Sequence, residues 1–242
     1  MKMYSKRLCS FLLILGLALS CQQKGGGKAD LKTDEDKAFY SLGVMFGGRL
    51  KDIKLSEHEL KLVRQGLSDS AMGAKTAVKA TDYRAQIDKI FKSRINSAVK
   101  DNKEAGKKHI AGLKGYQKTA SGLMYKIDRP GSAKKPKPTQ TVEVHYKGTL
   151  IDGTVFDSSY DRKKTINFPL NRVIPGWTEG LQLIGEGGKV NLVIPSELAY
   201  GDRGAPPNVP GGSTLIFDVE LMKVTDTPAP KAPKAPKAPK KK

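Results

Sequence analysis

The chain has 242 residues, a formal net charge of +19 at pH 7 and only two cysteines. This length allows one medium or two small domains. The charge implies attraction to anionic surfaces, but it indicates neither a fold nor sequence-specific binding, so no specific nucleic-acid partner is expected. Beyond the first twenty residues, no stretch is long and apolar enough to span a membrane. The sequence also has no metal-site spacing of Cys and His and no phosphate-binding glycine loop, and no metal or cofactor is expected.

The N-terminus has the pattern of an export signal. Three cations among the first seven residues precede an almost unbroken apolar run from Leu8 to Leu19. The run is too short to span a bilayer comfortably and ends in small residues. We therefore predict a signal peptide over residues 1–20, followed by a Gly- and Lys-rich tether over residues 21–32.

The end of this signal also suggests lipidation. Ala18-Leu19-Ser20-Cys21 resembles a bacterial lipobox, in which the signal is cut before a cysteine that then carries lipid. Because Cys9 lies inside the signal, Cys21 would be the single cysteine of the mature chain, and acylation would explain it. Gln22 after the cysteine would then indicate sorting to the outer membrane. The alternative is a generic cut nearby and a soluble periplasmic product.

Two capping boxes predict the first helices of a helical domain over residues 33–119. Thr33 with Asp36, and Ser56 with Glu59, have the required spacing, and apolar residues follow each pair at helical intervals. These signals predict two helices, each with one apolar stripe.

Glycines and charges indicate where the helices stop. Gly47-Gly48 is expected to interrupt the first helix late, and Gly73 to end the second. A third helix could start at Thr81, with an apolar stripe that gives way to charge from Lys100 to Lys108. A helix that is polar all round bridges domains or is not stably packed. Three such helices cannot close a core alone, so pairing with a second copy is the expected way to bury the stripes.

From about Thr119 onward, the pattern becomes that of strands. Alternation predicts strands over 123–127, 141–150, 155–156, 166–170, 189–194 and 214–224, with one short helix over 177–184. Asp152-Gly153 is a hairpin signal. A strand-dominated set with a single helix predicts an α+β domain over residues 120–225.

The last residues, 226–242, contain repeated Ala-Pro-Lys units and six lysines. Proline at every third position removes hydrogen-bond donors and favours extended, solvated backbone, so we predict a disordered tail. A spacer or solubiliser is one role for it. Electrostatic attachment to lipid headgroups, cell-wall polymer or nucleic acid is the alternative.

Five ordered blocks in the second domain carry a family resemblance. They are Val144-His145-Tyr146-Lys147-Gly148, Gly153-Thr154-Val155-Phe156-Asp157-Ser158-Ser159, Val173-Ile174-Pro175-Gly176-Trp177, Ala199-Tyr200-Gly201 and Leu215-Ile216-Phe217-Asp218-Val219-Glu220-Leu221. In this order they resemble the FKBP-type peptidyl-prolyl cis/trans isomerases. The resemblance implies a twisted antiparallel sheet wrapped around one helix, and rotation of X-Pro amides without a cofactor or metal. Such a reaction suits an apolar pocket, since no bond is made or broken.

The resemblance also implies roles for individual residues. The proline pocket would be lined by Tyr146, Phe156, Val173, Ile174, Trp177 and Phe217, with Trp177 as its floor. Asp157 would face the amide, Tyr200 would hold the substrate carbonyl through its hydroxyl, and Arg162 would pair with or orient Asp157 and Tyr146. Taken singly, several of these residues could be plain core residues, and only the joint pattern favours a pocket.

Three further positions concern the edge of this pocket and its selectivity. Val209 would line the rim in the loop after Tyr200. Ile166, counted among the substrate-binding residues, stands where many family members have an aromatic lining residue, and Ala205 stands where the best-known member has a histidine. These departures are expected to alter substrate preference and macrolide affinity more than the existence of activity.

The first half carries a second resemblance. Lys37-Ala38-Phe39-Tyr40-Ser41-Leu42-Gly43 and Gln65-Gly66-Leu67-Ser68-Asp69 resemble the dimerisation domain of the macrophage infectivity potentiator subgroup. This implies a V-shaped homodimer with the two catalytic domains apart and a cleft for unfolded chains between them. The partners expected for the whole chain are proline-containing, unfolded or partly folded exported proteins, macrolide inhibitors as FKBP ligands, and a membrane through lipidated Cys21. A holdase chaperone with a secondary isomerase site, or a surface-interaction module using the basic tail, are the alternatives.

Overall fold

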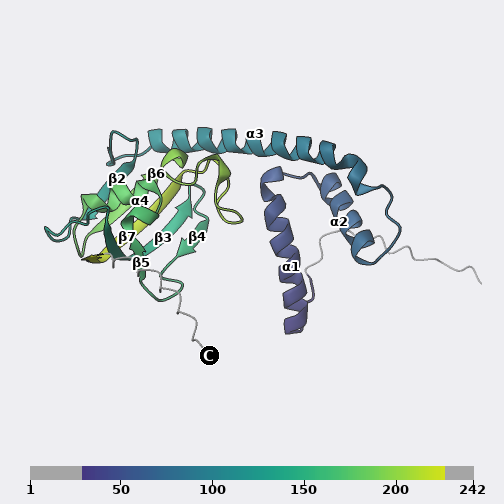
Figure 1. Ribbon diagram of the computed structural model, residues 1–242, viewed down its shortest axis with the longest axis horizontal. Coiled ribbons are helices and arrows are strands. Elements are labelled where there is room, and N and C mark those ends of the chain that lie inside the picture. Colours follow the sequence, from purple (N-terminus) through teal and green to yellow (C-terminus); the bar gives the residue numbers. More distant parts are fainter. Residues whose placement is uncertain (1–28, 227–242) are drawn as a thin grey trace, which may run out of the picture. The chain divides into compact units, whose positions relative to one another are not determined.

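The structure is a computed structural model that describes residues 29–226 (Figure 1). The predicted signal peptide, Cys21, most of the tether and the tail beyond Asp226 lie outside the described residues. The described chain divides between Leu42 and Gly43 into two compact units.

Helices occupy the first half of the described chain. They are α1 (Asp34–Leu50), α2 (Glu57–Ala71) and α3 (Arg84–Ala111), with single turns η1 (Lys51–Ile53) and η2 (Ala80–Tyr83) before α2 and α3. Both predicted capping boxes form. The Thr33 hydroxyl accepts the Asp36 N–H at 3.0 Å, and the Ser56 hydroxyl accepts the Glu59 N–H at 3.3 Å.

Three expectations for these helices need correction. Gly47-Gly48 does not interrupt α1, which continues to Leu50, because glycine weakens a helix but keeps its backbone N–H. The third helix starts at Arg84 rather than Thr81, since residues 80–83 form a 3-10 turn. Of the two alternatives for its charged stretch, the unpacked one is wrong, because α3 continues to Ala111 and buries Gly106.

The second half forms one antiparallel sheet, as predicted for an α+β domain. Its strands are β1 (Gln117–Lys118), β2 (Met124–Arg129), β3 (Gln140–Leu150), β4 (Val155–Ser158), β5 (Ile166–Pro169), β6 (Lys189–Ile194) and β7 (Leu215–Asp226). The order is β1-β2-β6-β7-β3-β4, and β5 also pairs with β3. The sheet thus starts at Gln117, before the predicted boundary at 120. Two residues are too few to show an alternating pattern.

One short helix, α4 (Pro175–Gly180), packs on the sheet and is extended by the turn η4 (Leu181–Leu183). It starts two residues before the predicted helix, with Pro175 in the first turn, where a missing N–H costs nothing. Ideal Cβ atoms on Gly176 and Gly180 would lie 2.4 Å from Ile194 and 2.7 Å from Leu192. Glycine at these two positions therefore brings the helix close to β6.

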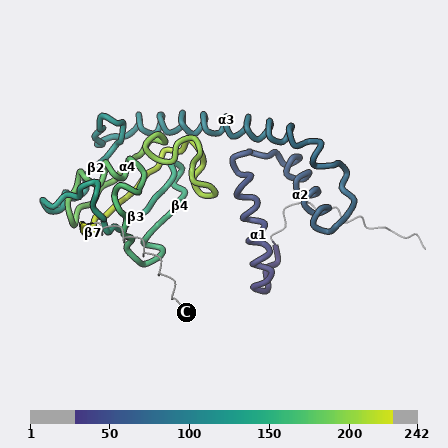
Figure 2. Tube along the Cα trace, viewed as in Figure 1, coloured from purple at the N-terminus to yellow at the C-terminus, as the bar shows by residue number. Residues whose placement is uncertain are grey.

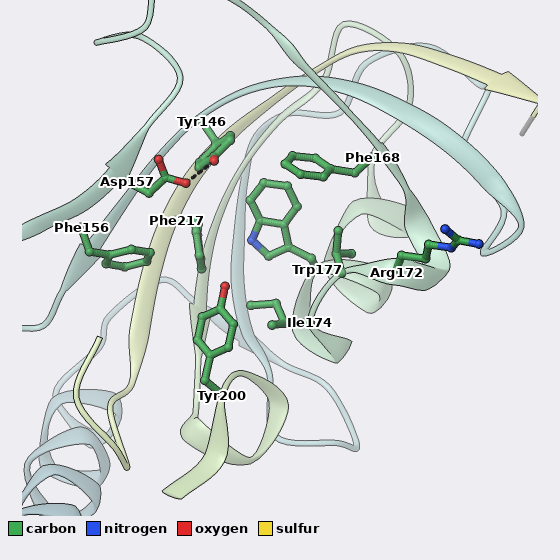
Figure 3. Close-up of a pocket in the computed structure, with 10 residues that line it drawn as sticks. Tyr146, Phe156, Asp157, Phe168, Arg172, Ile174, Trp177, Tyr200 and Phe217 are labelled. Carbon is green, nitrogen blue, oxygen red and sulfur yellow. Dashed lines mark hydrogen bonds between the residues drawn. The ribbon is translucent and has the colours of Figure 1, made fainter. Parts of the chain in front are cut away.

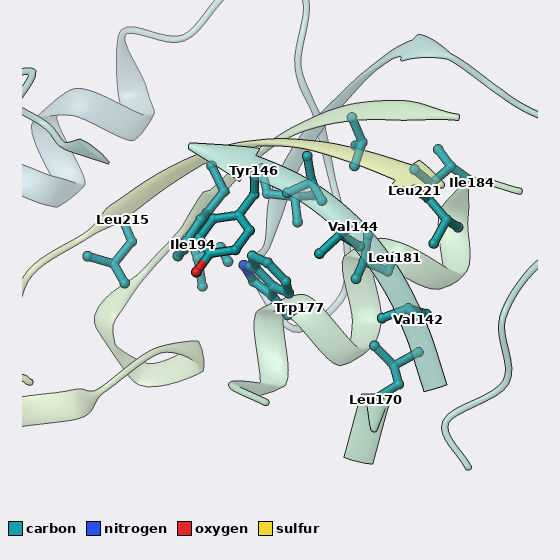
Figure 4. Packing of buried hydrophobic residues seen from close by; sticks show 14 of the residues in the cluster. Val142, Val144, Tyr146, Leu170, Trp177, Leu181, Ile184, Ile194, Leu215 and Leu221 are labelled. Atoms are coloured by element: carbon teal, nitrogen blue, oxygen red, sulfur yellow. The ribbon is translucent and has the colours of Figure 1, made fainter. Parts of the chain in front are cut away.

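The core lies between α4 and the sheet (Figure 4). Every second residue of β3 is buried, including Val142, Val144 and Tyr146, so one face of this strand points to the helix. Trp177 and Leu181 meet this face from the helical side. Each fully buried aliphatic side chain of this kind contributes about 1.5–3 kcal/mol, so this domain has a core of its own.

The chain path from α3 into the sheet can be followed in Figure 2. Just after α3, the hydroxyl of Tyr116 donates a 2.6 Å hydrogen bond to Asn191 on β6, which ties the connection to the sheet. Within residues 29–226, no helix is both long and apolar enough to cross a membrane.

Candidate active site

A cavity of about 270 Å³ opens above Trp177, between the sheet, the start of α4 and the loop after β6 (Figure 3). It is lined by Tyr146, Phe156, Asp157, Phe168, Arg172, Val173, Ile174, Trp177, Tyr200 and Phe217. Five of these ten residues are Phe, Trp or Tyr from strands and α4, and a sixth aromatic, Tyr200, comes from a loop. The cavity is therefore mainly an aromatic box with few polar groups.

The rings are locked edge to face around Trp177. Its indole lies 5.0 Å from the ring of Tyr146 and 5.2 Å from that of Phe217, at interplanar angles of 87° and 81°. Strand alternation places these partners, since Tyr146 on β3 and Phe217 on β7 both point inward. Such contacts add about 0.5–1.5 kcal/mol each beyond area burial, so the floor and walls of the cavity are rigid.

A glycine makes room for the remaining wall. Gly148 on β3 is the register partner of both Asp157 on β4 and Phe217 on β7. A Cβ atom on it would lie 2.6 Å from the Phe156 ring and 2.8 Å from the Phe217 ring. The two phenylalanines, whose rings are 5.4 Å apart, pack over the backbone only because this position has no side chain.

Asp157 is the acidic group of the cavity, and it is held by two neighbours. Its Oδ2 accepts a hydrogen bond from the Tyr146 hydroxyl, and its Oδ1 is paired with Nη1 of Arg162. Nη2 of Arg162 also donates to the Tyr146 hydroxyl at 3.0 Å, which closes the triangle. The carboxylate side chain remains 39% exposed, so it is fixed in orientation and still faces the cavity.

This arrangement fixes the protonation states of the triangle. Burial alone would raise the pKa of Asp157, but the hydrogen bonds from Arg162 and Tyr146 outweigh it, and the pKa lies below its ordinary value. Burial, together with the bond to Asp157, raises the pKa of Tyr146 to about 12. At neutral pH the cavity therefore contains a carboxylate anion beside a phenol that keeps its proton.

Tyr200 supplies a second hydroxyl from the opposite side. It lies between the turns η5 (Ser196–Leu198) and η6 (Gly201–Arg203), and its hydroxyl points into the cavity (Figure 3). Burial, and then the charge of Asp157, raise its pKa, so it too is a proton donor at neutral pH. Within residues 29–226 no hydrogen bond to this hydroxyl is found, which leaves it available to a ligand.

The indole N–H of Trp177 is fully buried and has no hydrogen-bond partner among the described residues. Figure 3 shows this nitrogen on the side facing Phe217. The ring of Phe217, with its centroid 5.2 Å from that of the indole, lies on that side and could act only as a weak acceptor. The indole acts here as an apolar floor.

The structure gathers most of the residues expected at this site. Eight line the cavity: Tyr146, Phe156, Asp157, Val173, Ile174, Trp177, Tyr200 and Phe217. Arg162 lies behind Asp157, in the orienting position expected for it. His145 faces the other side of β3, where it stacks on Tyr160 at 4.7 Å, as strand alternation predicts.

Two expected residues lie elsewhere. Val209 is a 3% exposed core residue, not a rim residue, because its backbone pairs with Ala205 and turns the side chain inward. Ile166 packs at the edge of the core, outside the lining. The aromatic ring of this strand comes from Phe168 instead.

Two lining residues were not anticipated from the sequence. Phe168 follows Ile166 by two positions and so shares its face, which the strand period could have indicated. Arg172 precedes the Val173-Ile174 block and carries no such signal. In Figure 3 its guanidinium points away from the rings, so it contributes a cation at the cavity margin.

Over residues 29–226, no cluster of three or more His, Cys, Asp or Glu side chains is placed to hold a metal ion. The cavity itself presents an enclosed aromatic surface, one carboxylate held by two neighbours, and the phenol of Tyr200. These groups can bind an apolar ring, exclude water from it, and hydrogen-bond a polar group attached to it.

Two family profiles match the chain. The one described as "FKBP-type peptidyl-prolyl cis-trans isomerase" matches residues 132–222, and the one described as "Domain amino terminal to FKBP-type peptidyl-prolyl isomerase" matches residues 35–127. Together they cover both the helical part and the sheet. Both halves of the chain therefore match profiles that belong to one class of isomerase.

Known proteins of this class are similar in sequence and structure to most of the chain. The FKBP-type isomerase FkpA of Escherichia coli K12 is 39% identical over 219 residues, which are 84% of this chain and 80% of that protein. Outer membrane protein MIP of Legionella longbeachae is 34% identical, over 87% of this chain and 94% of that one. The crystal structure of E. coli FkpA superposes with a TM-score of 0.61, covering 82% of this chain and all of that chain. The chain belongs to the family of FKBP-type peptidyl-prolyl cis/trans isomerases.

Proposed function

We propose that the cavity above Trp177 binds the prolyl ring of a client protein and lowers the barrier to rotation about the preceding amide. The observation that carries this proposal is the combination of an aromatic box with one ionised carboxylate fixed in its wall. Amide resonance sets a barrier of about 18–20 kcal/mol, and uncatalysed X-Pro rotation takes tens to hundreds of seconds. A pocket that favours the twisted amide over the planar one accelerates this step.

The planar amide carries excess negative charge on its oxygen, and this charge decreases as the C–N bond twists. Transfer from water into an aromatic cavity therefore disfavours the planar form more than the twisted one. A fixed anion such as Asp157 facing the amide acts in the same direction, because it opposes charge on the carbonyl oxygen. Tyr200 would orient the substrate by donating its hydroxyl to a carbonyl. No acid, base or nucleophile is required.

The test is catalysis of proline-limited refolding, or of rotation in a chromogenic X-Pro peptide, by the chain truncated before residue 22. Asp157→Ala and Tyr200→Phe should each lower kcat/KM by tenfold or more, which is about 1.4 kcal/mol or more of transition-state stabilisation. A macrolide that occupies the cavity should block the wild type. Wild-type activity unchanged by both substitutions would refute the assigned site.

We further propose export and lipid anchoring at Cys21, supported by the signal-like N-terminus and by a relative named as an outer-membrane protein. Mass spectrometry of the protein isolated from its membrane should then show a diacylated or triacylated N-terminal cysteine. Cys21→Ser should release the chain into the soluble fraction. A free, unmodified N-terminus after another residue would support plain cleavage instead.

We also propose a homodimer formed through the helices. Among the described residues, α1 and α2 have no buried side chain. Their large apolar side chains are exposed, including Phe39, Leu42, Met45, Phe46, Leu62, Val63 and Leu67. Ideal Cβ atoms on Gly43 and Gly47, which share one face of α1, would meet no atom within 4 Å. A second copy is the natural cover for such a surface.

Two substitutions at one position test this interface. Gly47→Ala should leave the dimer intact and, if anything, strengthen the helix. Gly47→Leu should weaken association, because it places a large side chain where helices approach closely. Sedimentation velocity reports the mass directly. A monomeric wild type, or a dimer indifferent to Gly47→Leu, would count against an interface at this face.

Chaperone activity is the second candidate function, and the same exposed apolar helices favour it. A holdase would bind unfolded chains through the part of these surfaces that the dimer leaves uncovered, and it would not need the cavity. Asp157→Ala should therefore lose isomerase activity but still suppress aggregation of a proline-free client. Loss of both activities together would place client binding in the cavity and refute a separate holdase surface.

A further inference from the structure

The position of Tyr200 depends on the loop that carries it. The other aromatic residues of the cavity lie on strands or on α4 and pack into the core, whereas Tyr200 is 42% exposed. Its hydroxyl has no hydrogen bond within residues 29–226 that would fix the side chain. The placement of its ring over the cavity therefore depends largely on the backbone of residues 200–214, here called the Tyr200 loop.

The Tyr200 loop is closed by its own hydrogen bonds. The N–H of Gly204 donates to the carbonyl of Tyr200 at 3.1 Å, and that of Gly212 donates to the carbonyl of Gly201 at 2.9 Å. Ala205 and Val209 exchange backbone bonds of 2.8 and 3.0 Å between these points. These bonds tie the two ends of the loop to each other, so the loop forms one closed unit.

Helix α3 lies against this loop. The side-chain amide of Asn102 donates a 2.9 Å hydrogen bond to the carbonyl of Gly211. One turn further on, Gly106 is buried against Thr214, whose Oγ1 would lie 2.1 Å from a Cβ atom at position 106. On the same flank Nζ of Lys103 lies 2.5 Å from Asp202. One face of α3 thus contacts the loop at both ends.

Glycines in the loop allow this close approach. An ideal Cβ atom on Gly212 would lie 2.5 Å from the carbonyl oxygen of Val99, and one on Gly211 would lie 2.9 Å from the Val99 side chain. Gly212 also has a φ of +75°, which other residues rarely adopt. The backbone of α3 and the backbone of the loop are therefore in direct contact, without room for a side chain between them.

We infer that α3 is a positioning element of the active site, in which Asn102 and Gly106 hold the Tyr200 loop and thereby set the Tyr200 hydroxyl over the cavity. The inference rests on the role proposed above for Tyr200. It gives the helix that precedes the sheet a part in catalysis, beyond connecting the two halves of the chain. Asn102 is a positioning residue in this scheme, since it touches the loop and not the cavity.

The test is a double-mutant cycle in the full mature chain, with kcat/KM on an X-Pro peptide as the readout. Asn102→Leu keeps the side-chain size but leaves the Gly211 carbonyl without its donor, so kcat/KM should fall by about three- to tenfold. The same substitution at Asn96, an exposed asparagine of α3 with no side-chain hydrogen bond among residues 29–226, is the matched control and should have no effect.

The cycle is completed with Tyr200→Phe. If Asn102 acts through the Tyr200 hydroxyl, Asn102→Leu should cost nothing further in the Tyr200→Phe background. An equal loss in both backgrounds, or no loss in the wild type, would overturn the inference while leaving the proposed function intact. Full activity of the Tyr200→Phe variant would overturn the inference together with the role proposed for the Tyr200 hydroxyl, whereas the proposed function would still be tested by Asp157→Ala.

A second pair of variants distinguishes positioning from general damage. Gly106→Ala brings a methyl group against Thr214 and should lower kcat/KM, and adding Thr214→Ala should restore part of the loss by removing the clashing oxygen. Trp177, the only tryptophan of the chain, reports the cavity floor through its fluorescence. Its emission should stay constant throughout. Lost activity with altered emission and no rescue would show disruption of the domain and refute positioning.

Discussion

At the scale of single residues, the site depends on a charge that is kept ionised in a largely apolar place. Burial opposes ionisation of Asp157, and Arg162 with Tyr146 reverses the balance. The Arg162 side chain is 44% exposed, so this ion pair matters more for the orientation and protonation of Asp157 than for the stability of the fold. The stability that comes from ionised Asp157 is therefore fully present above the ordinary pKa of 3.8. It is lost only as the pH falls through the lowered pKa of the folded state.

Replacing Arg162 should raise the pH below which kcat/KM begins to fall. In Arg162→Met, burial acts on Asp157 with only the Tyr146 bond against it, so the pKa rises and kcat/KM should begin to fall at a higher pH than in the wild type. The measurement is kcat/KM against pH from neutral downward. Arg64→Met, which removes the same charge from an exposed position on α2, should leave the profile unchanged. An unshifted acid limb in Arg162→Met would contradict the assigned cause.

Gly148 makes the most demanding prediction at this scale. Alanine there would force the Phe156 and Phe217 rings apart, because its Cβ atom would lie less than 3 Å from both. Overpacking of this kind costs about 1–3 kcal/mol. Gly148→Ala should therefore lower both the free energy of unfolding and kcat/KM, and shift the emission of Trp177. Gly66→Ala on α2, where nothing lies within 4 Å, is the control and should be neutral or stabilising.

At the scale of elements, the side chain of Arg94 connects α3 with η1 and α2 through hydrogen bonds. Arg94 on α3 donates to the buried Ile53 carbonyl at 3.3 Å and to Glu59 on α2 at 3.1 Å. Glu59 also accepts the backbone N–H of Ser56 at 2.8 Å, within the capping box. A single carboxylate thus caps one helix and binds the next. The hydrogen bond from Arg94 is the main cause that lowers the pKa of Glu59 from 4.5 to about 2.

The stability contributed by these hydrogen bonds of Glu59 should depend on pH in a defined window. Since the pKa of Glu59 is lowered by folding, the contribution is complete above about 4.5 and disappears as pH falls toward 2. Glu59→Gln should have a lower Tm than the wild type at pH 7, and the difference should vanish near pH 2. Glu57→Gln removes a charge from the same turn without a bond to Arg94. An equal effect of Glu57→Gln would point to net charge instead.

The sequence predicts elements well where a local signal suffices. Both capping boxes and the long alternating runs of β3, β6 and β7 are local, and they are confirmed within a residue or two. The missed features depend on tertiary context. The two-residue strand β1 exists only through its pairing with β2, and the charged end of α3 is docked because of glycines in a loop a hundred residues away.

The cavity shows the same division. The residue types of the site can be assigned from the ordered blocks, because those blocks fix both identity and spacing. Val209 could not be placed that way, since its direction is set by a backbone pair with Ala205. Ile166 and Phe168 share one face of β5, and the strand pattern alone does not tell which of the two lines the cavity. The local sequence pattern thus predicts which residues belong to the site, whereas tertiary packing decides which way each side chain points.

At the scale of the whole molecule, the two halves differ in how they are stabilised. The sheet domain encloses its own core of more than a dozen buried side chains around Trp177. The helices α1 and α2 have 17 and 15 residues and bury none of them within the described chain. Isolated helices of this length are marginal in water. Their stability must come from something that covers their apolar faces, and the dimer proposed above would supply it.

This difference predicts two unfolding transitions that respond differently to protein concentration. A hundredfold dilution disfavours a dimer by about 2.7 kcal/mol and leaves a monomeric domain unaffected. The loss of helical ellipticity at 222 nm should therefore shift to lower temperature on dilution, whereas the fluorescence of Trp177 should report a constant midpoint. In Gly47→Leu, the midpoint of the transition at 222 nm should be low at every protein concentration, as it is for the diluted wild type. Two midpoints that both ignore concentration would contradict the dimer, and two that move together would show that the sheet domain also depends on association.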